Sequence, residues 1–114
     1  MNLNLIVFRS KIPKVLAEWY ARFGLVFEYH RHGKGPLHYS ADIDGLILEI
    51  YPLKRSQTEA DLSLRLGFEV EGLDRLIAQL PDVVSPPKRS EWGYRAVVAD
   101  PEGRRVELVE KPLD

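Results

Sequence analysis

The stretch ADIDGLILE at residues 41–49 returns in altered form as ADPEGRRVE at residues 99–107. Each copy predicts an acidic turn with a glycine suited to positive φ, followed by an apolar strand that carries one glutamate, Glu49 or Glu107. Because a carboxylate in an apolar strand is costly to bury without a partner, we expect both glutamates to face a cavity. A repeat present in only two copies indicates a duplicated unit within one domain and excludes a solenoid.

The composition of the chain is typical of a small globular protein. Its 114 residues, 45% hydrophobic and 29% charged, predict a single domain over residues 1–114. A net charge of −1 excludes the basic surface of a nucleic-acid-binding protein. The sequence has no apolar run near the ~20 residues that cross a bilayer, no signal-peptide pattern and no cysteine. We therefore expect a cytoplasmic protein with neither a nucleic-acid nor a membrane partner.

The predicted order of elements is βαβββ in each half of the chain. Repeat one is expected over residues 3–52, the connector over 53–62 and repeat two over 63–110. The strands of repeat one are expected at 3–8, 25–32, 37–42 and 46–51, with a helix between Pro13 and Gly24. The strands of repeat two are expected at 64–70, 83–90, 94–99 and 104–109, with a helix over 73–80 that Pro81 ends.

These features resemble those of the vicinal oxygen chelate superfamily, which includes glyoxalase I, bleomycin-resistance proteins and extradiol dioxygenases. The resemblance rests on the paired βαβββ pattern, on Trp19-Tyr20 before Gly24-Leu25, and on the stretches 44–52 and 99–108. It implies an α+β fold in which tandem βαβββ repeats form an incompletely closed, eight-stranded, barrel-like sheet around a cavity. It also implies a small-molecule ligand, often a homodimer and often a divalent metal.

The metal pattern of the superfamily is incomplete in this sequence. By resemblance, the ligands lie on the first and last strand of each repeat, at Leu5, Glu49, Arg65 and Glu107. Leucine cannot coordinate a metal, and a guanidinium is a permanent cation. We therefore predict no cofactor; if zinc, nickel, iron or manganese does bind, Glu49 and Glu107 are the expected ligands. Strand alternation instead predicts that Arg65 lies between the two glutamates and neutralises them, the alternative being that it points to solvent.

Histidines and aromatic residues are the other candidate site residues. The pair His30-x-His32 is either a metal-binding pair or an exposed strand end. His38 is expected to face the cavity as a proton donor or acceptor, or to be a packed structural histidine. Four aromatic residues are expected to line a ligand pocket: Tyr39, Tyr51, Trp92 and Tyr94. For Trp92, the alternative is a lid over the core.

Three functions fit this set of residues. The leading prediction is a glyoxalase/bleomycin-resistance-like protein that binds a small organic molecule, paired with a glutamate if cationic, in the cavity between its repeats without the usual metal. The alternative is a lyase or isomerase of glyoxalase type, or a dioxygenase, in which Glu49 or Glu107 acts as a base or metal ligand. The third is an interaction module or a regulatory subunit with a vestigial pocket that binds no ligand. Whether the protein is an enzyme stays open on sequence alone.

Overall fold

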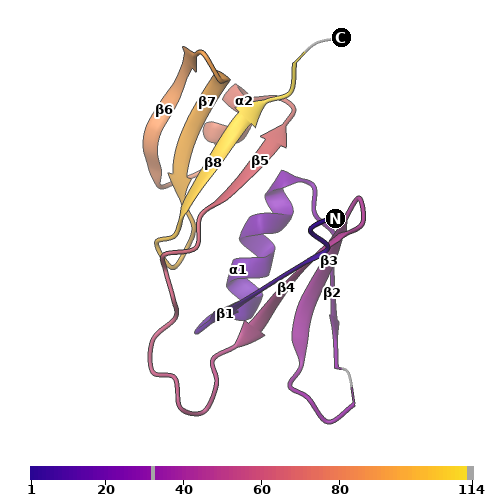
Figure 1. The fold of residues 1–114 in the computed structure, drawn as a ribbon. Coiled ribbons are helices and arrows are strands. Elements are labelled where there is room, and N and C mark those ends of the chain that lie inside the picture. The colour runs from indigo at the N-terminus through magenta and orange to yellow at the C-terminus, as the bar shows by residue number, and fades with distance from the viewer. Residues whose placement is uncertain (32, 113–114) are drawn as a thin grey trace. The chain divides into compact units, whose positions relative to one another are not determined.

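The computed structural model describes residues 1–31 and 33–112. The chain forms two compact units, Met1–Asp61 and Leu62–Asp114, and each is described by itself. Both have the element order βαβββ, which confirms the predicted tandem repeat (Figure 1). The eight strands form two open sheets of four, β1-β4-β3-β2 and β5-β8-β7-β6. That the whole chain is a single domain stays a prediction.

The first unit consists of β1 (Leu5–Ser10), α1 (Pro13–Tyr20), the 3-10 turn η1 (Ala21–Phe23), β2 (Phe27–His30), β3 (His38–Ile43) and β4 (Leu46–Pro52). The second unit consists of β5 (Leu66–Val70), α2 (Leu73–Ile77), β6 (Val83–Ser90), β7 (Gly93–Ala99) and β8 (Arg105–Glu110). In each unit the first strand runs parallel to the last, so β1 pairs with β4 and β5 with β8. No helix in the described residues is long and apolar enough to span a membrane.

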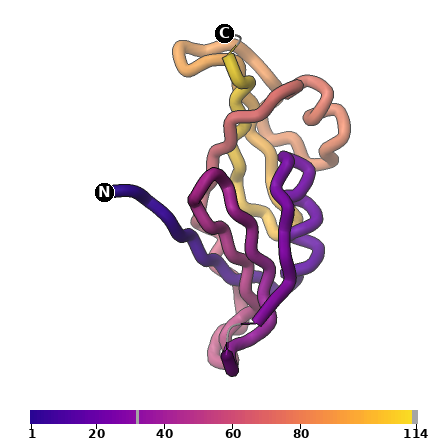
Figure 2. The backbone as a smooth tube through the Cα atoms, turned by 90° about the vertical axis from the view of Figure 1, so that its right-hand side faces the viewer, coloured from indigo at the N-terminus to yellow at the C-terminus, as the bar shows by residue number. Residues whose placement is uncertain are grey.

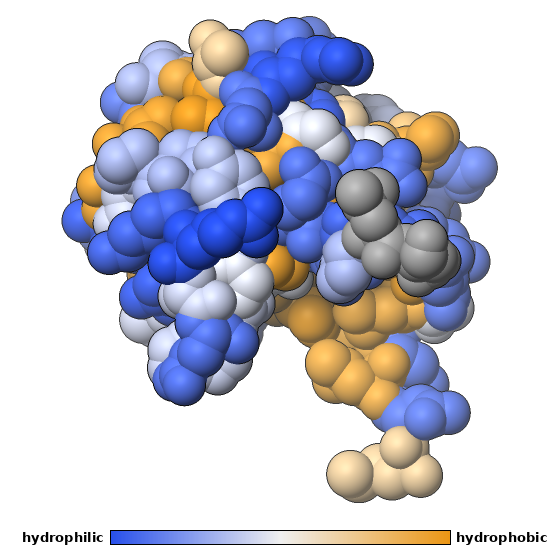
Figure 3. Space-filling model, turned by 90° about the horizontal axis from the view of Figure 1, so that it is seen from above, coloured by the Kyte–Doolittle hydropathy of each residue, from blue (hydrophilic) through white to orange (hydrophobic). Residues whose placement is uncertain are grey.

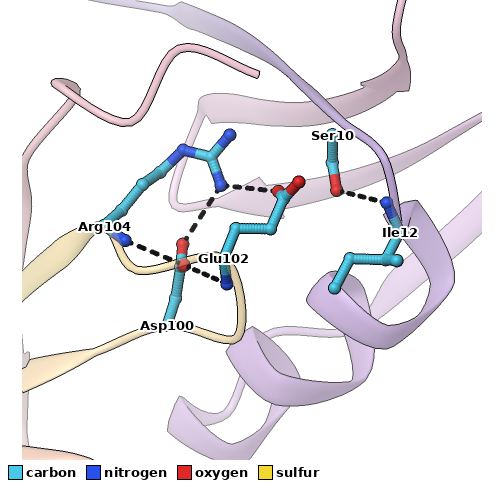
Figure 4. A network of polar contacts seen from close by, with 5 residues as sticks. All are labelled: Ser10, Ile12, Asp100, Glu102 and Arg104. Atoms are coloured by element: carbon cyan, nitrogen blue, oxygen red, sulfur yellow. Dashed lines mark hydrogen bonds and ion pairs between the residues drawn. The ribbon is translucent and has the colours of Figure 1, made fainter. Parts of the chain in front are cut away.

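Helix α1 forms where its sequence satisfies both ends. Pro13 stands in the first turn, where its missing N–H leaves no hydrogen bond unmade, and the Ser10 hydroxyl accepts a bond from the Ile12 amide at 2.8 Å (Figure 4). Gly24 ends the segment at φ 100°, a conformation that glycine adopts without a steric penalty. The helix lies along its own sheet and buries Leu16 and Tyr20 against it (Figures 1 and 2).

Helix α2 is shorter than the predicted 73–80. It ends at Ile77 because the amides of Gln79 and Leu80 bond to carbonyls three residues back, which tightens the last turn ahead of Pro81. It begins where the Glu110 carboxylate accepts hydrogen bonds from the amides of Gly72 and Leu73, at 2.9 and 3.0 Å. The last strand of the unit therefore fixes the position of its helix.

The repeated acidic stretch forms a turn in both units, as predicted. Asp44 and Gly45, at φ 51° and 97°, make the two-residue hairpin between β3 and β4, and Asp42 accepts a bond from the Gly45 amide at 2.8 Å. In the second unit Asp100 accepts bonds from the amides of Glu102 and Arg104, at 2.8 and 3.1 Å (Figure 4). The Arg104 guanidinium then bonds to both carboxylates and is 1% exposed. Only the second copy of the turn is therefore closed by a buried arginine.

Each sheet has one face towards its helix and one face away from it. Leu48 and Ile50 of β4, and Val106 and Leu108 of β8, are almost fully buried on the helix side. In the space-filling view, hydrophilic residues cover much of the visible face, and apolar residues reach the surface in separate patches (Figure 3). Since successive strand residues point to opposite faces, Glu49 and Glu107 lie on the faces away from the helices.

Candidate functional site

Glu107 lies in the middle of β8, on the face of the second sheet that points away from α2. On that face its neighbours in register are Gly67 of β5 and Val97 of β7. A Cβ placed on Gly67 would lie 3.8 Å from the Cβ of Glu107, so the absence of a side chain at Gly67 leaves the sheet surface clear beside the base of the Glu107 side chain. The side chain of Glu107 is 34% exposed, which keeps it within reach of solvent and of a ligand.

Two arginines hold this carboxylate, one at each oxygen. The Arg65 guanidinium lies 2.9 Å from Oε1, and the Arg95 guanidinium donates a hydrogen bond to Oε2. Arg65 precedes β5, whereas the sequence predicted it inside a strand, and it is half-exposed. Two cations around one anion leave the trio with a net positive charge. Glu107 is therefore not the free carboxylate that a cationic ligand or a metal would bind.

Arg95 is a site residue that the sequence analysis missed. It lies on β7 in register with Val109 of β8 and with Lys88 of β6, so it shares a face with Glu107. Alternation supplies the signal: Arg95 and Val97 share one face of the strand, and Ala96 and Val98 are buried on the other. The pattern does not by itself identify the partner strand, which is why the ion pair with Glu107 was not predicted.

Trp92 stands at the end of the hairpin between β6 and β7. Its amide donates a hydrogen bond to the Ser90 hydroxyl at 3.1 Å, while its indole is 69% exposed. The Arg95 guanidinium lies 6.0 Å from the centre of the indole ring, at the limit of a cation–π contact. An exposed tryptophan beside a charged cluster offers a flat apolar surface next to polar groups.

Two adjoining cavities open on this face of the second unit, and Trp92, Arg95 and Glu107 line both. The first, which we call the glycine lobe, has a volume of about 460 Å³, and its other lining residues are Gly67, Phe68, Glu69 and Val109. The second, which we call the basic lobe, has a volume of about 430 Å³, and its charged lining residues include Arg65 and Lys88. Cavities of this size are typical of small-molecule sites.

In the first unit, Glu49 pairs with a histidine. His38 is 1% exposed; its Nε2 lies 3.2 Å from Oε2 of Glu49, and its Nδ1 lies 3.1 Å from the carbonyl of Pro36. Because the Glu49 side chain is only 12% exposed, this pair is better shielded from water than Glu107 and its arginines.

Tyr51 lies next to this pair on the same face of the first sheet. Its ring is stacked on that of His38, with centroids 4.1 Å apart and an angle of 6° between the planes. The Arg9 guanidinium lies 5.0 Å from the centre of the same ring and donates a hydrogen bond to the Pro52 carbonyl at 3.0 Å. Tyr51 is therefore packed between His38 and Arg9.

The other two predicted tyrosines lie on the helix sides of their sheets. Tyr39 is in register with the buried Ile50, and its ring lies 4.4 Å from that of Tyr29. The Tyr94 hydroxyl donates a hydrogen bond to Asp74 of α2 at 2.7 Å. That bond, with some burial, raises the pKa of Tyr94 above its ordinary value of 10.0. Neither ring lies on the face that carries the glutamate of its unit.

The residues at the metal positions of the superfamily do not fit a divalent ion. Leu5 offers no donor atom, and Arg65 brings a cation that already binds Glu107. Among residues 1–31 and 33–112, no three His, Asp or Glu side chains are grouped as a metal site. His30 lies beside His38, with ring centroids 4.9 Å apart, whereas His32 of the predicted His-x-His pair lies outside the described residues.

Solved structures with the same fold include both enzymes and binding proteins. An oxidase, ChaP-H2, shares 19% identity over 98% of this chain and 94% of its own, with a TM-score of 0.74. A glyoxalase/bleomycin resistance protein/dioxygenase family enzyme from Burkholderia phytofirmans PsJN shares 17% identity over 96% and 98%, with a TM-score of 0.72. TnmS3, an antibiotic binding protein from Streptomyces sp. CB03234, shares 20% over 98% and 97%, with the same TM-score.

No protein-family model and no curated protein sequence matches the chain. At these identities the structural likeness establishes the fold and leaves the activity open. The chain shares the fold of these structures, which is the fold that its resemblance to the vicinal oxygen chelate superfamily implied.

Proposed function

We propose that this protein binds a small organic molecule in the cavity of its second unit. The observation that carries the proposal is the pair of adjoining lobes, about 460 and 430 Å³, that share Trp92, Arg95 and Glu107. Both volumes lie within the range of small-molecule pockets, and the lining combines an exposed indole with fixed polar groups. That TnmS3, a protein of the same fold, is an antibiotic binding protein supports a binding function.

A ligand screen tests this proposal. Because a ligand that binds only the folded state stabilises it, a thermal-shift screen of small organic compounds should find compounds that raise the Tm. Each such compound should lose most of its effect in the variant Trp92→Leu. The matched control is Leu62→Ala, which removes an exposed apolar side chain of the same unit that does not line either lobe. Compounds whose effects are equal in all three proteins would contradict the proposed site.

A second candidate function is proton transfer at Glu49. The observation that favours it is the shielded position of Glu49 beside His38, with 3.2 Å between Oε2 and Nε2, since a carboxylate next to an imidazole is an arrangement used in acid–base catalysis. Glu107 is the weaker candidate base because guanidinium groups bind both of its oxygens. This function is tested separately from the second-unit cavity, by NMR of the exchange with D2O of C–H protons next to the carbonyl group of small ketones and aldehydes. The exchange should occur with the wild-type chain and stop in Glu49→Gln; equal exchange with both proteins would contradict this function.

We also propose that the chain acts as a homodimer in the cytoplasm. Sedimentation velocity of the full chain tests this proposal, and we expect a particle with twice the 13.1 kDa mass of the chain. A particle of monomer mass at micromolar concentration would contradict it.

A further inference from the structure

The two lobes of the second-unit cavity carry opposite charges. The basic lobe places Arg65, Lys88 and Arg95 around the single carboxylate Glu107. The glycine lobe is lined by one cation, Arg95, and two carboxylates, Glu69 and Glu107. A bound molecule therefore meets excess positive charge at one end of the cavity only, and an anionic group is favoured at that end.

The ion pairs with Glu107 hold the two arginines of the basic lobe in place, but they engage only part of the N–H donors of each guanidinium. Glu107 forms an ion pair with one terminal nitrogen of each guanidinium, and a guanidinium has five N–H donors. The remaining donors are fixed relative to one another before a ligand arrives, which lowers the entropy lost on binding. The planar fork of a guanidinium matches the geometry of a carboxylate, and charge-assisted bonds of this kind are stronger than neutral ones.

Lys88 adds a third cation on the same face. It is in register with Arg95, and paired residues of neighbouring antiparallel strands point to the same side of a sheet. The Ser90 hydroxyl, which also lines this lobe, donates to the carbonyl of Gly93 at 3.2 Å and so helps to hold the hairpin that carries Trp92. An anion in the basic lobe thus lies close to the exposed indole.

We propose that the ligand of this cavity is a flat aromatic molecule that carries one carboxylate. The carboxylate binds in the basic lobe to Arg65, Lys88 and Arg95, and the aromatic ring lies against Trp92. This inference rests on the proposed function and narrows it to one chemical class. The indole supplies the ring contact, since offset or edge-on aromatic pairs add to the burial of apolar area.

Three probes of one shape test the class of ligand. Titration of the full chain with 2-naphthoate, neutral 2-naphthamide and cationic 2-naphthylmethylammonium, followed by calorimetry, compares charge at constant ring size. We expect the acid to bind about tenfold more tightly than the amide and the amine to bind most weakly. Because salt screens partly exposed charges, the ratio of the affinity of the acid to that of the amide should fall as the salt concentration is raised from 0.05 to 0.5 M.

Two variants locate the effect. Arg65→Gln should reduce the advantage of the acid over the amide to less than about threefold, because it removes one of the three cations. The matched control Lys54→Gln removes an exposed cation of the first unit and should leave the advantage unchanged. Circular dichroism of both variants checks that they fold.

Equal affinity for acid and amide, tightest binding of the amine, or no binding of any of the three probes overturns the inference. The proposed function fails on a different result, namely that no compound of the broad screen gives a response that depends on Trp92. If the screen finds a cationic ligand whose effect depends on Trp92, the proposed ligand class is wrong, but the proposed binding function still holds.

Discussion

Asp100 and Asp42 occupy the same place in the two copies of the repeated turn, but their surroundings differ. Asp100 is 2% exposed, accepts two backbone hydrogen bonds and faces the buried Arg104 guanidinium. Burial alone would lower the pKa of Arg104, but the bond to Glu102 and the charge of Asp100 outweigh it, so that this pKa lies above its ordinary value. Asp42 is exposed and accepts one bond, from Gly45.

Replacing each aspartate by asparagine should therefore have unequal effects. Asp100→Asn weakens a buried charge pair and should lower the free energy of unfolding by about 2–3 kcal/mol. Asp42→Asn, the matched control, should cost about 0.5 kcal/mol or less, as is usual for exposed contacts. Urea unfolding of both variants measures the difference, and equal losses would contradict the role assigned to Arg104.

Tyr94 makes the stability of the second unit sensitive to alkaline pH. Its hydrogen bond to Asp74 raises the pKa of the hydroxyl above 10.0 in the folded state, so the folded chain holds this proton more tightly than the unfolded chain. The contribution is present below about pH 10 and is lost as pH rises through the folded-state pKa. Tyr94→Phe should be less stable than wild type at pH 8, and the gap should close above pH 10.

Asp74→Asn removes the charged acceptor of this bond, so the stability of this variant should depend less on pH between 8 and 11 than that of wild type, as in Tyr94→Phe. A gap between Tyr94→Phe and wild type that stays constant from pH 8 to pH 11, measured by urea unfolding, would show that the hydrogen bond does not stabilise the folded state.

At the scale of elements, the glycines of β5 and β7 have different tasks. Gly67 lacks strain, and an added Cβ would lie in ordinary contact at 3.8 Å from Glu107. Gly93 has a φ of +109°, and an added Cβ would lie 3.2 Å from Val109. Gly67→Ala should thus change stability by less than about 1 kcal/mol and can increase it, whereas Gly93→Ala should lose about 1–3 kcal/mol. Thermal unfolding of the two variants checks this; equal losses would contradict it.

The elements show which features of the fold the sequence could predict. Pro13 and the Asp44-Gly45 hairpin set local geometry through their own backbone chemistry, so the helix start and the turn were predicted correctly. The helix itself ends at Tyr20, and Gly24 ends the 3-10 turn η1 that follows it. The end of α2 was predicted three residues too late, since the choice between three- and four-residue hydrogen bonds is a small energy difference ahead of Pro81.

Strand β6 forms over Val83–Ser90, as predicted, although it contains two prolines. It tolerates Pro86 and Pro87 because it is an edge strand that pairs only with β7, and its register shifts between Ser85 and Lys88, where the prolines stand. Edge position depends on the order of strands in the sheet, which a local pattern does not contain.

The candidate site was only partly predictable for the same reason. Alternation put Arg65 and Glu107 on strand faces that were expected to look into one cavity, and the structure joins the two side chains in an ion pair. The predicted position of Arg65 between both glutamates stays a prediction. The contribution of Arg95 required the register of β7 against β8. Tyr39 and Tyr94 were grouped with the glutamates by their aromatic character, but the pleat directs them to the helix sides of their sheets.

At the scale of the whole molecule, we predict that the chain unfolds as a single domain. Each unit has about half of the 114 residues, a size at which one small core gives little net stability. The full chain should show one urea transition by both tryptophan fluorescence and circular dichroism, and separately produced fragments 1–61 and 62–114 should be markedly less stable. Two separate transitions would contradict the single domain.

The place at which an aromatic acid binds decides whether the cavity of the second unit is the ligand site. In an NMR titration of the 15N-labelled full chain with 2-naphthoate, we expect saturable shifts at the Trp92 indole N–H, the Gly67 amide and the Arg95 side chain. The indole of Trp19, which is 6% exposed in the core of the first unit, serves as the internal control and should not shift. Saturable shifts confined to the first unit, around Ser40 and Tyr51, would contradict a ligand site in the second unit.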